Sequence, residues 1–181
     1  MSLKEERCLK FGASECQIII GEIKTMITHL DKQGNPTMVD VTSKQASHRT
    51  ATARSIVCMP AEVLEHLAGG DLQSKKGPVF QTAIIAGIMA AKKTGDLIPL
   101  CHPLGLDNCN ITISINELQE IVIDCTASIT AKTGIEMEAL VGASIAALTV
   151  YDMCKAMSHN IVIKETKLLS KTGGKRDFNR A

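Results

Sequence analysis

The sequence predicts one α+β domain in which helices cover one face of an antiparallel sheet. Two neighbouring segments, 110–116 and 121–129, alternate apolar and polar residues, and a long helical stretch at 135–157 follows them. A period of two is typical of strands, and an apolar repeat near 3.6 is typical of helices. Helices packed on one side of an antiparallel sheet cover such patterns most simply.

The chain is expected to enter this domain through two strands. A turn at 31–36 precedes a weak strand signal at 38–41, and a β-prone run ends the strand predicted at 49–59. Pro60 then suits the first turn of a short helix, which Gly69-Gly70 is expected to stop.

A second helix is predicted to open at Gly77-Pro78, and Gly95 is expected to end it. Apolar residues recur along it with the spacing of one helical face: Val79, Ile84, Ile88 and Ala91. The segment 97–103 follows, and its two prolines exclude a helix interior, so a rigid extended loop is expected.

The second half of the chain completes the order ββααββαβ. Residues 110–116 and 121–129 are predicted to form a β-hairpin. The long helix is expected to bury Leu140, Ala143, Ala147, Leu148 and Tyr151, and a last strand over 161–169 leads to a polar, basic tail. We therefore expect an N-terminal extension, residues 1–35, and a single domain, residues 36–181.

Composition narrows the classes of function. The 181 residues carry a net charge of +1 and include three Phe, one Tyr and no Trp, which is a poor basis for stacking nucleic-acid bases. The seven Cys are odd in number and lack a C-x-x-C spacing, so a reducing, cytoplasmic location is expected. No targeting peptide is visible, and the apolar run 139–150 is too short for a membrane span.

The loop at 97–103 carries Cys101 and His102 between two prolines. Such a loop loses little entropy when a ligand binds, and His transfers protons near neutral pH. A buried Cys beside a surface His remains an alternative. Two such residues do not make a zinc site, which needs three or four ligands.

Carboxylates occur at both ends of the long helix. Glu136 and Glu138 lie in its first turn, where the helix dipole favours them in any case. They are also candidates for acid–base work or for hydrogen bonds to a purine or pterin edge. Asp152 and Lys155, three residues apart, are either a surface ion pair or a pair tuned for proton transfer. Glu138 and Asp152 are separated by about 21 Å along a helix, so a site that uses both is expected to combine two subunits.

Basic residues near the predicted loops are candidates for binding phosphate, with a solvated basic rim as the alternative. They are Lys44, Arg49, Lys75, Lys76, Lys171, Lys175 and Arg176. No P-loop or dinucleotide-binding glycine motif is present, so a nucleotide fold is not expected.

Seven segments together resemble one family. The most specific are DLIPLCHP at 96–103, KTGIEMEAL at 132–140 and LTVYDMCKA at 148–156, and the others lie at 38–41, 76–79, 85–88 and 173–175. They are similar, in the same order, to the MoaC family of cyclic pyranopterin monophosphate synthases. Pro78 and Ile84 depart from the commonest family pattern, which puts the orientation of Lys76 in doubt.

The resemblance implies a ferredoxin-like fold and a lyase of molybdenum cofactor biosynthesis. The family converts 3′,8-cyclo-7,8-dihydro-GTP to the cyclic pterin and releases pyrophosphate, in homohexamers built as trimers of dimers with the site at the dimer interface. No cofactor is required by the sequence, and Mg²⁺ accompanying the pyrophosphate is left open.

Site residues carried over by motif begin with Asp152 as the catalytic acid–base residue and Lys155 beside it. The substrate would be bound by Leu100, Cys101, His102, Met137, Glu138, Glu136, Lys76, Arg49, Lys44 and Lys171. Two other readings remain: a non-catalytic binding module of the same fold, and a structural oligomerisation domain. Neither gives a reason for this combination of polar side chains.

Overall fold

The structure, a computed structural model, describes residues 30–31 and 33–180. The chain divides after Asp40 into two units, each described here by itself. The predicted extension, 1–35, lies almost wholly outside the described residues, and its boundary stays a prediction. The predicted turn is confirmed, because the Asp31 carboxylate accepts hydrogen bonds from the backbone N–H groups of Gln33 and Asn35, at 2.9 and 2.8 Å.

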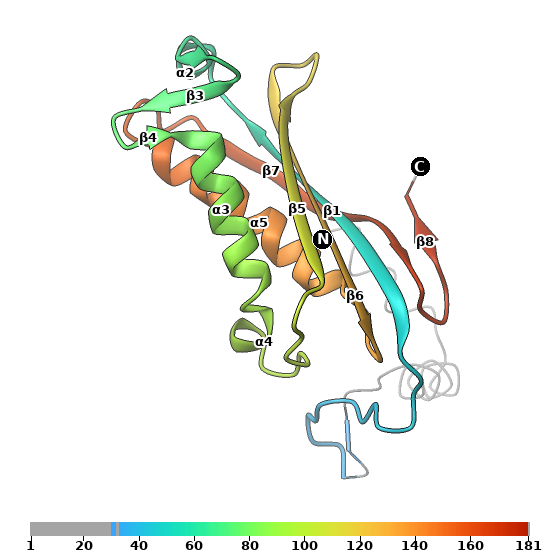
Figure 1. Cartoon of the computed structure of the whole chain (residues 1–181). Coiled ribbons are helices and arrows are strands. Elements are labelled where there is room, and N and C mark those ends of the chain that lie inside the picture. The colour runs from blue at the N-terminus through green and yellow to red at the C-terminus, as the bar shows by residue number, and fades with distance from the viewer. Residues whose placement is uncertain (1–29, 32, 181) are drawn as a thin grey trace, which may run out of the picture. The chain divides into compact units, whose positions relative to one another are not determined.

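The second unit is built on a five-stranded antiparallel sheet (Figure 1). In spatial order its strands are β5 Asn108–Ile115, β6 Glu120–Ala131, β1 Ser47–Cys58, β7 Val162–Thr172 and β8 Phe178–Asn179. The strand predicted at 49–59 and the β5–β6 hairpin are confirmed. The basic tail is not wholly irregular, because β8 pairs with β7.

Four helices and a small second sheet complete the unit. The helices are α2 Ala61–Leu64, α3 Val79–Ala91, α4 Thr94–Leu97 and α5 Glu136–Cys154, and the small sheet joins β2 Leu67–Ala68, β3 Asp71–Ser74 and β4 Gly77–Pro78. The helices α3 and α5 lie side by side on one face of the large sheet (Figure 1). The order β1-α3-β5-β6-α5-β7 is the ferredoxin-like arrangement, as expected.

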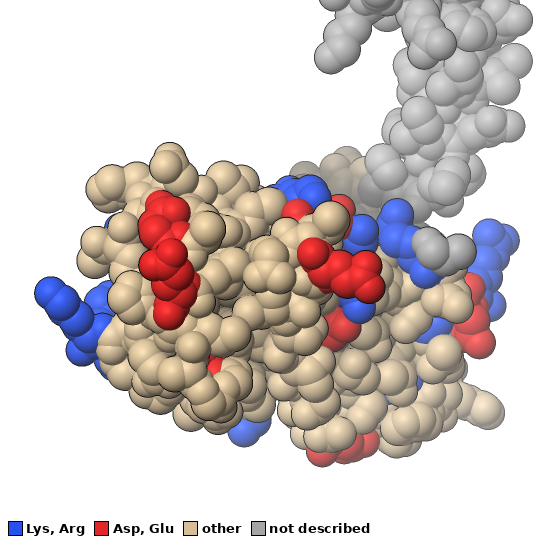
Figure 2. Space-filling model, turned by 90° about the horizontal axis from the view of Figure 1, so that it is seen from above, with Lys and Arg blue, Asp and Glu red and all other residues tan. Residues whose placement is uncertain are grey.

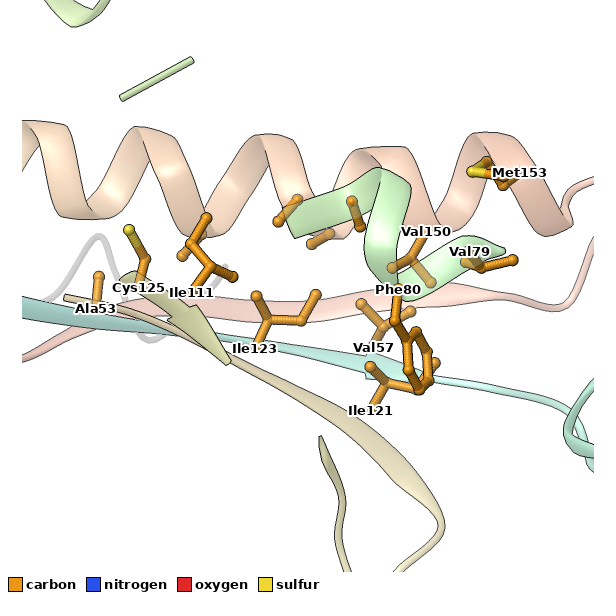
Figure 3. Packing of buried hydrophobic residues seen from close by; sticks show 14 of the residues in the cluster. Ala53, Val57, Val79, Phe80, Ile111, Ile121, Ile123, Cys125, Val150 and Met153 are labelled. Carbon is orange, nitrogen blue, oxygen red and sulfur yellow. The ribbon is translucent and has the colours of Figure 1, made fainter. Parts of the chain in front are cut away.

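The core fills the space between this sheet face and the two long helices. Every second residue of β1 from Ala51 to Val57 is buried, and β6 shows the same alternation. Figure 3 shows Val57, Ile121 and Ile123 pointing from the sheet toward Val150 of α5. Full burial of such a side chain stabilises the fold by about 1.5–3 kcal/mol.

The contact between α3 and α5 depends on two glycines. A Cβ atom on Gly87 of α3 would lie 2.7 Å from the carbonyl oxygen of Gly142 in α5. A Cβ atom on Gly142 would lie 2.6 Å from Sγ of Cys125 in β6. Both distances are too short for a side chain, so α5 lies close to both α3 and the sheet because these positions have none.

Several expectations for single elements were wrong. Residues 38–41 form no strand, since a four-residue alternation is too short to fix a strand by itself. The short helix ends at Leu64 rather than near Gly69-Gly70, because Leu67 pairs with Leu72 in the small sheet. Gly95 does not end α3, which stops at Ala91; it lies inside α4.

The predicted buried face of α5 is correct for Ala143 and Ala147 but wrong for Leu148, which is 52% exposed because it turns away from the sheet. In the described part of the chain, α5 alone is long and apolar enough to cross a membrane. Half of the residues in that stretch are buried in the fold, as in the core helix of a globular domain.

Candidate active site

Three of the predicted site residues meet at the C-terminal end of α5. Asp152 lies in the last turn, where its Oδ2 accepts a hydrogen bond from Lys76 Nζ and its Oδ1 pairs with Lys155 Nζ, both at 2.7 Å. Lys76 Nζ also donates to the backbone carbonyl of Asp152 at 3.2 Å. Carbonyls in the last turn of a helix lack intrahelical partners, so Lys76 also stabilises the end of α5.

The two lysines hold Asp152 in its ionised form. Hydrogen bonds from Lys155 and then Lys76 lower the pKa of Asp152 to about 2, and Asp152 in turn raises the pKa of Lys155. The three side chains are each about half exposed, at 53, 51 and 54% for Lys76, Asp152 and Lys155. Ion pairs that exposed add little to stability, so this cluster contributes little to folding.

A second group of predicted site residues surrounds the N-terminal end of α5. Lys171 Nζ of β7 pairs with Glu136 Oε1 at 2.7 Å. Arg49 of β1 donates from Nε to the Ala131 carbonyl at 2.9 Å and from its second terminal nitrogen to the Lys132 carbonyl at 3.3 Å. Burial alone would raise the pKa of Glu136, but the hydrogen bond from Lys171 and the charge of Arg49 lower it overall.

Glu138 lies two residues further along the helix and has a different environment. It is 2% exposed, and neither carboxylate oxygen has a hydrogen-bond partner. Burial raises its pKa, and the charge of Glu136 adds to this effect. The hydroxyl of Thr133 is likewise buried and unpartnered. Buried polar groups in folded proteins are nearly always paired, so these atoms indicate a place for another molecule's polar groups.

The loop before β5 brings Cys101 to this end of α5. Burial, and next the charge of Glu138, raise the pKa of the Cys101 thiol. The loop packs closely against Gly95 of α4, where a Cβ atom would lie 2.9 Å from Cα of Pro103. Leu100 and His102, the neighbours of Cys101, are half-buried.

The remaining predicted residues flank the same end. Met137 lies between the two glutamates and is 39% exposed. Lys44 is exposed in a turn over residues 41–44. Lys132 Nζ donates to the carbonyl of Thr42 at 2.8 Å, which ties that turn to the segment before α5.

The two groups are not brought together within one chain. Glu138 and Asp152 are separated by about 21 Å along α5. A site within one chain would place both residues deep in one pocket, but Asp152 is half exposed. The site shared between subunits therefore stays a prediction. On the face shown in Figure 2, the charged side chains of the described residues form small, separate groups on a largely uncharged surface.

Sequence reasoning missed two residues near the N-terminal end of α5. Thr133 has the unpartnered hydroxyl, and Lys132 fixes the turn that carries Lys44. Both belong to the motif at 132–140, but that motif does not reveal which of its polar side chains is buried. Their placement depends on the end of β6 pairing with β1, and these two strands lie far apart in the sequence.

Comparison with known proteins decides the family. The MoaC family model matches residues 38–174. A cyclic pyranopterin monophosphate synthase of Xanthomonas campestris pv. campestris (strain 8004) is 56% identical over 155 residues, which are 86% of this chain and 94% of that protein. The chain belongs to the MoaC family.

Two longer relatives contain a region similar to this family member. A molybdenum cofactor biosynthesis bifunctional protein of Synechocystis sp. (strain ATCC 27184 / PCC 6803 / Kazusa) is 51% identical over 159 residues, 86% of this chain but 46% of that protein. A molybdenum cofactor biosynthesis protein 1 of Dictyostelium discoideum is 48% identical over 165 residues, 82% of this chain and 26% of that protein.

Proposed function

We propose that the chain converts 3′,8-cyclo-7,8-dihydro-GTP to cyclic pyranopterin monophosphate with release of pyrophosphate, as a lyase of molybdenum cofactor biosynthesis. The observation that carries the proposal is the Asp152 carboxylate held between two lysines, in a MoaC family member with synthases among its relatives. This cluster supplies both a proton-transfer group and cations for phosphate.

Substrate binding would change the chemistry of Asp152. A carboxylate with a pKa of about 2 is a weak base. Phosphate oxygens compete with Asp152 for the N–H donors of Lys76 and Lys155. As the lysines turn toward phosphate, the pKa of Asp152 rises toward its usual value, and Asp152 becomes a stronger base. The anionic substrate would thus activate its own acid–base residue.

The N-terminal end of α5 would bind the heterocycle and further phosphate. The unpartnered groups of Glu138 and Thr133 suit the N–H and carbonyl groups along a purine or pterin edge. Cys101, His102, Leu100 and Met137 would line the same place, while Arg49, Lys171 and Lys44 would supply cations for phosphate. Glu136, paired with Lys171, would hold that lysine in position.

Within one chain the two ends of α5 lie far apart. We therefore propose that each site combines the C-terminal end of α5 from one subunit with the N-terminal end of α5 from another. The assembly would be a homohexamer, a trimer of dimers, acting in the cytoplasm on a small molecule. Any divalent cation would be bound by the pyrophosphate rather than by a set of protein ligands. Repeating the assay with a chelator tests whether such a cation takes part.

The test of function is direct. The purified protein is incubated with 3′,8-cyclo-7,8-dihydro-GTP, and pyrophosphate and the fluorescence of the oxidised pterin are measured. Asp152→Asn should lower turnover by about 10²–10⁴-fold, the usual contribution of a general acid or base. Asp124→Asn, which removes a carboxylate bonded to Arg54 in the middle of the sheet, is the matched control. A folded wild type without turnover would favour a binding module instead.

A further inference from the structure

Asp71 is a buried carboxylate with two hydrogen bonds to a helix that it does not belong to. It is 9% exposed, its Oδ1 accepts from the backbone N–H of Phe80 at 2.7 Å, and its Oδ2 accepts from that of Gln81 at 3.1 Å. These N–H groups belong to the first turn of α3, which has no intrahelical acceptors for them. The residue at the N-cap position, Pro78, supplies no side-chain cap.

The bonds of Asp71 close a hairpin around Lys76. Asp71 begins β3, and β3 pairs with β4, which leads directly into α3. At the turn, Ser74 Oγ accepts from the N–H of Lys76 at 3.1 Å and donates to the carbonyl of Gly77 at 3.0 Å. Gly77 has φ of +107°, a conformation that other residues rarely adopt. The hairpin is therefore tied at its base by Asp71 and at its tip by Ser74.

The hairpin presents Lys76 to the last turn of α5. Lys76 Nζ reaches both the carboxylate and the backbone carbonyl of Asp152. In the same turn, burial and then the charge of Asp71 raise the pKa of the Cys154 thiol to about 11. Lys155, the other cation at Asp152, comes from the end of α5 itself and does not depend on the hairpin.

We infer that Asp71 is a positioning residue, which acts through the β3–β4 hairpin to hold Lys76 against Asp152. This rests on the proposed function for its effect on turnover, but the contact itself can be tested without substrate. Asp71→Asn is the informative variant, since the amide keeps the size of the side chain. Its NH₂ group replaces an acceptor and faces an N–H group, so one of the two bonds to α3 is lost.

The first experiment measures the reactivity of single lysines. The intact protein is labelled briefly with an amine-acylating reagent, and the labelling of Lys76 and Lys155 is followed by mass spectrometry. In Asp71→Asn the labelling of Lys76 should rise toward the level found in Asp152→Asn, while that of Lys155 stays as in the wild type. Loosening of the whole fold would raise both. Labelling of Lys76 as in the wild type would overturn the inference.

The second experiment measures turnover in a double-mutant cycle. Asp71→Asn should lower kcat by up to about 10²-fold, the cost of misplacing a group at the site, but should have no further effect in a Lys76→Met background. An equal loss in both backgrounds would overturn the inference. If Asp71→Asn does not fold, Asp71→Ser replaces it, because the hydroxyl keeps one acceptor for α3. The labelling of Lys76 should then rise partway. Unchanged labelling of Lys76 in Asp71→Ser would also overturn the inference. Absence of turnover in the wild type would overturn the proposed function, and the labelling would still decide the role of Asp71.

Discussion

The two ends of α5 place acidic side chains in opposite environments. At the C-terminal end, Asp152 is half exposed, and two lysines lower its pKa to about 2. At the N-terminal end, Glu138 is buried without a partner, and burial raises its pKa. One helix thus holds one carboxylate ionised and pushes another toward its neutral form. Groups whose pKa values are moved apart in this way are suited to different tasks. We propose proton transfer for Asp152 and hydrogen bonding for Glu138.

The largest expected effect comes from mixing variants that each disable one end. Asp152→Asn and Glu138→Gln should each have low turnover alone. If each site of a dimer uses one end from each subunit, half of the randomly mixed dimers are hybrids, and one of the two sites in a hybrid is intact. Turnover should then recover to about a quarter of the wild-type value after the subunits are exchanged. Turnover that stays at background after exchange, with hybrids detected by native mass spectrometry, would mean that no site combines the two ends in this way.

Glu138→Met should make the protein more stable at neutral pH. The raised pKa of Glu138 means that the folded state keeps its proton to higher pH than the unfolded chain, so the wild type loses stability as pH rises through that range. Removing the unpartnered carboxylate should raise the free energy of unfolding at pH 7 by about 1–3 kcal/mol. The gain should shrink below about pH 4, where the unfolded chain is protonated too. Denaturant titrations at both pH values measure this.

The matched control at the same end is Glu136→Met. Glu136 has a lowered pKa, so its carboxylate contributes stability above the unfolded value and loses it as pH falls. Its removal leaves Lys171 without its ion-pair partner and should destabilise the protein. If both variants changed the free energy of unfolding in the same direction at pH 7, the claim that Glu138 destabilises the fold and Glu136 stabilises it would be wrong.

Gly95→Ala should disturb the N-terminal end of α5 alone. The added Cβ atom would lie 2.9 Å from Cα of Pro103, so the loop with Cys101 must shift, at a cost of about 1–2 kcal/mol. Labelling of the Cys101 thiol should change, whereas labelling of Lys76 should not. Gly105→Ala is the control in the same region, because a Cβ atom there has no atom within 4 Å other than those of the residue itself and its two chain neighbours.

The smallest effect on stability is expected for Lys155→Met. The hydrogen bond from Lys155 has the largest effect on the pKa of Asp152, so removing Lys155 should raise that pKa above about 2. Because the pair is half exposed, the melting temperature at pH 7 should hardly change. Lys164→Met is a useful comparison, since its partner Glu120 is buried and also has a pKa lowered to about 2. A larger loss in Lys155→Met than in Lys164→Met would contradict this account.

The sequence predicted those parts of the fold that repeat a pattern over many residues. The β5–β6 hairpin and the long helices follow from alternation and helical spacing, and the pair of Asp152 with Lys155 follows from positions three residues apart on a helix. Strands of two residues, such as β2 and β4, are too short to show a period. For this reason the small sheet was missed.

Contacts between distant residues were equally out of reach. Lys76 and Asp152 are 76 residues apart, and their contact depends on the turn that Asp71 and Ser74 hold. Glu138 was recognised as a candidate by its motif, but its isolation depends on how α5 packs on the sheet and on the loop with Cys101. Such burial is set by tertiary packing, which a local pattern does not encode.

The close contact of α3 with α5 limits how this protein can change during evolution. Gly87 and Gly142 already carry the smallest possible side chain, and a single added carbon would meet backbone or sulfur. Neither position can drift by gradual changes in size, and a larger residue at one would require simultaneous changes on two neighbouring elements. Sequence divergence is therefore expected to accumulate at the exposed positions of the described residues, while the distance between the two ends of α5 is inherited almost unchanged.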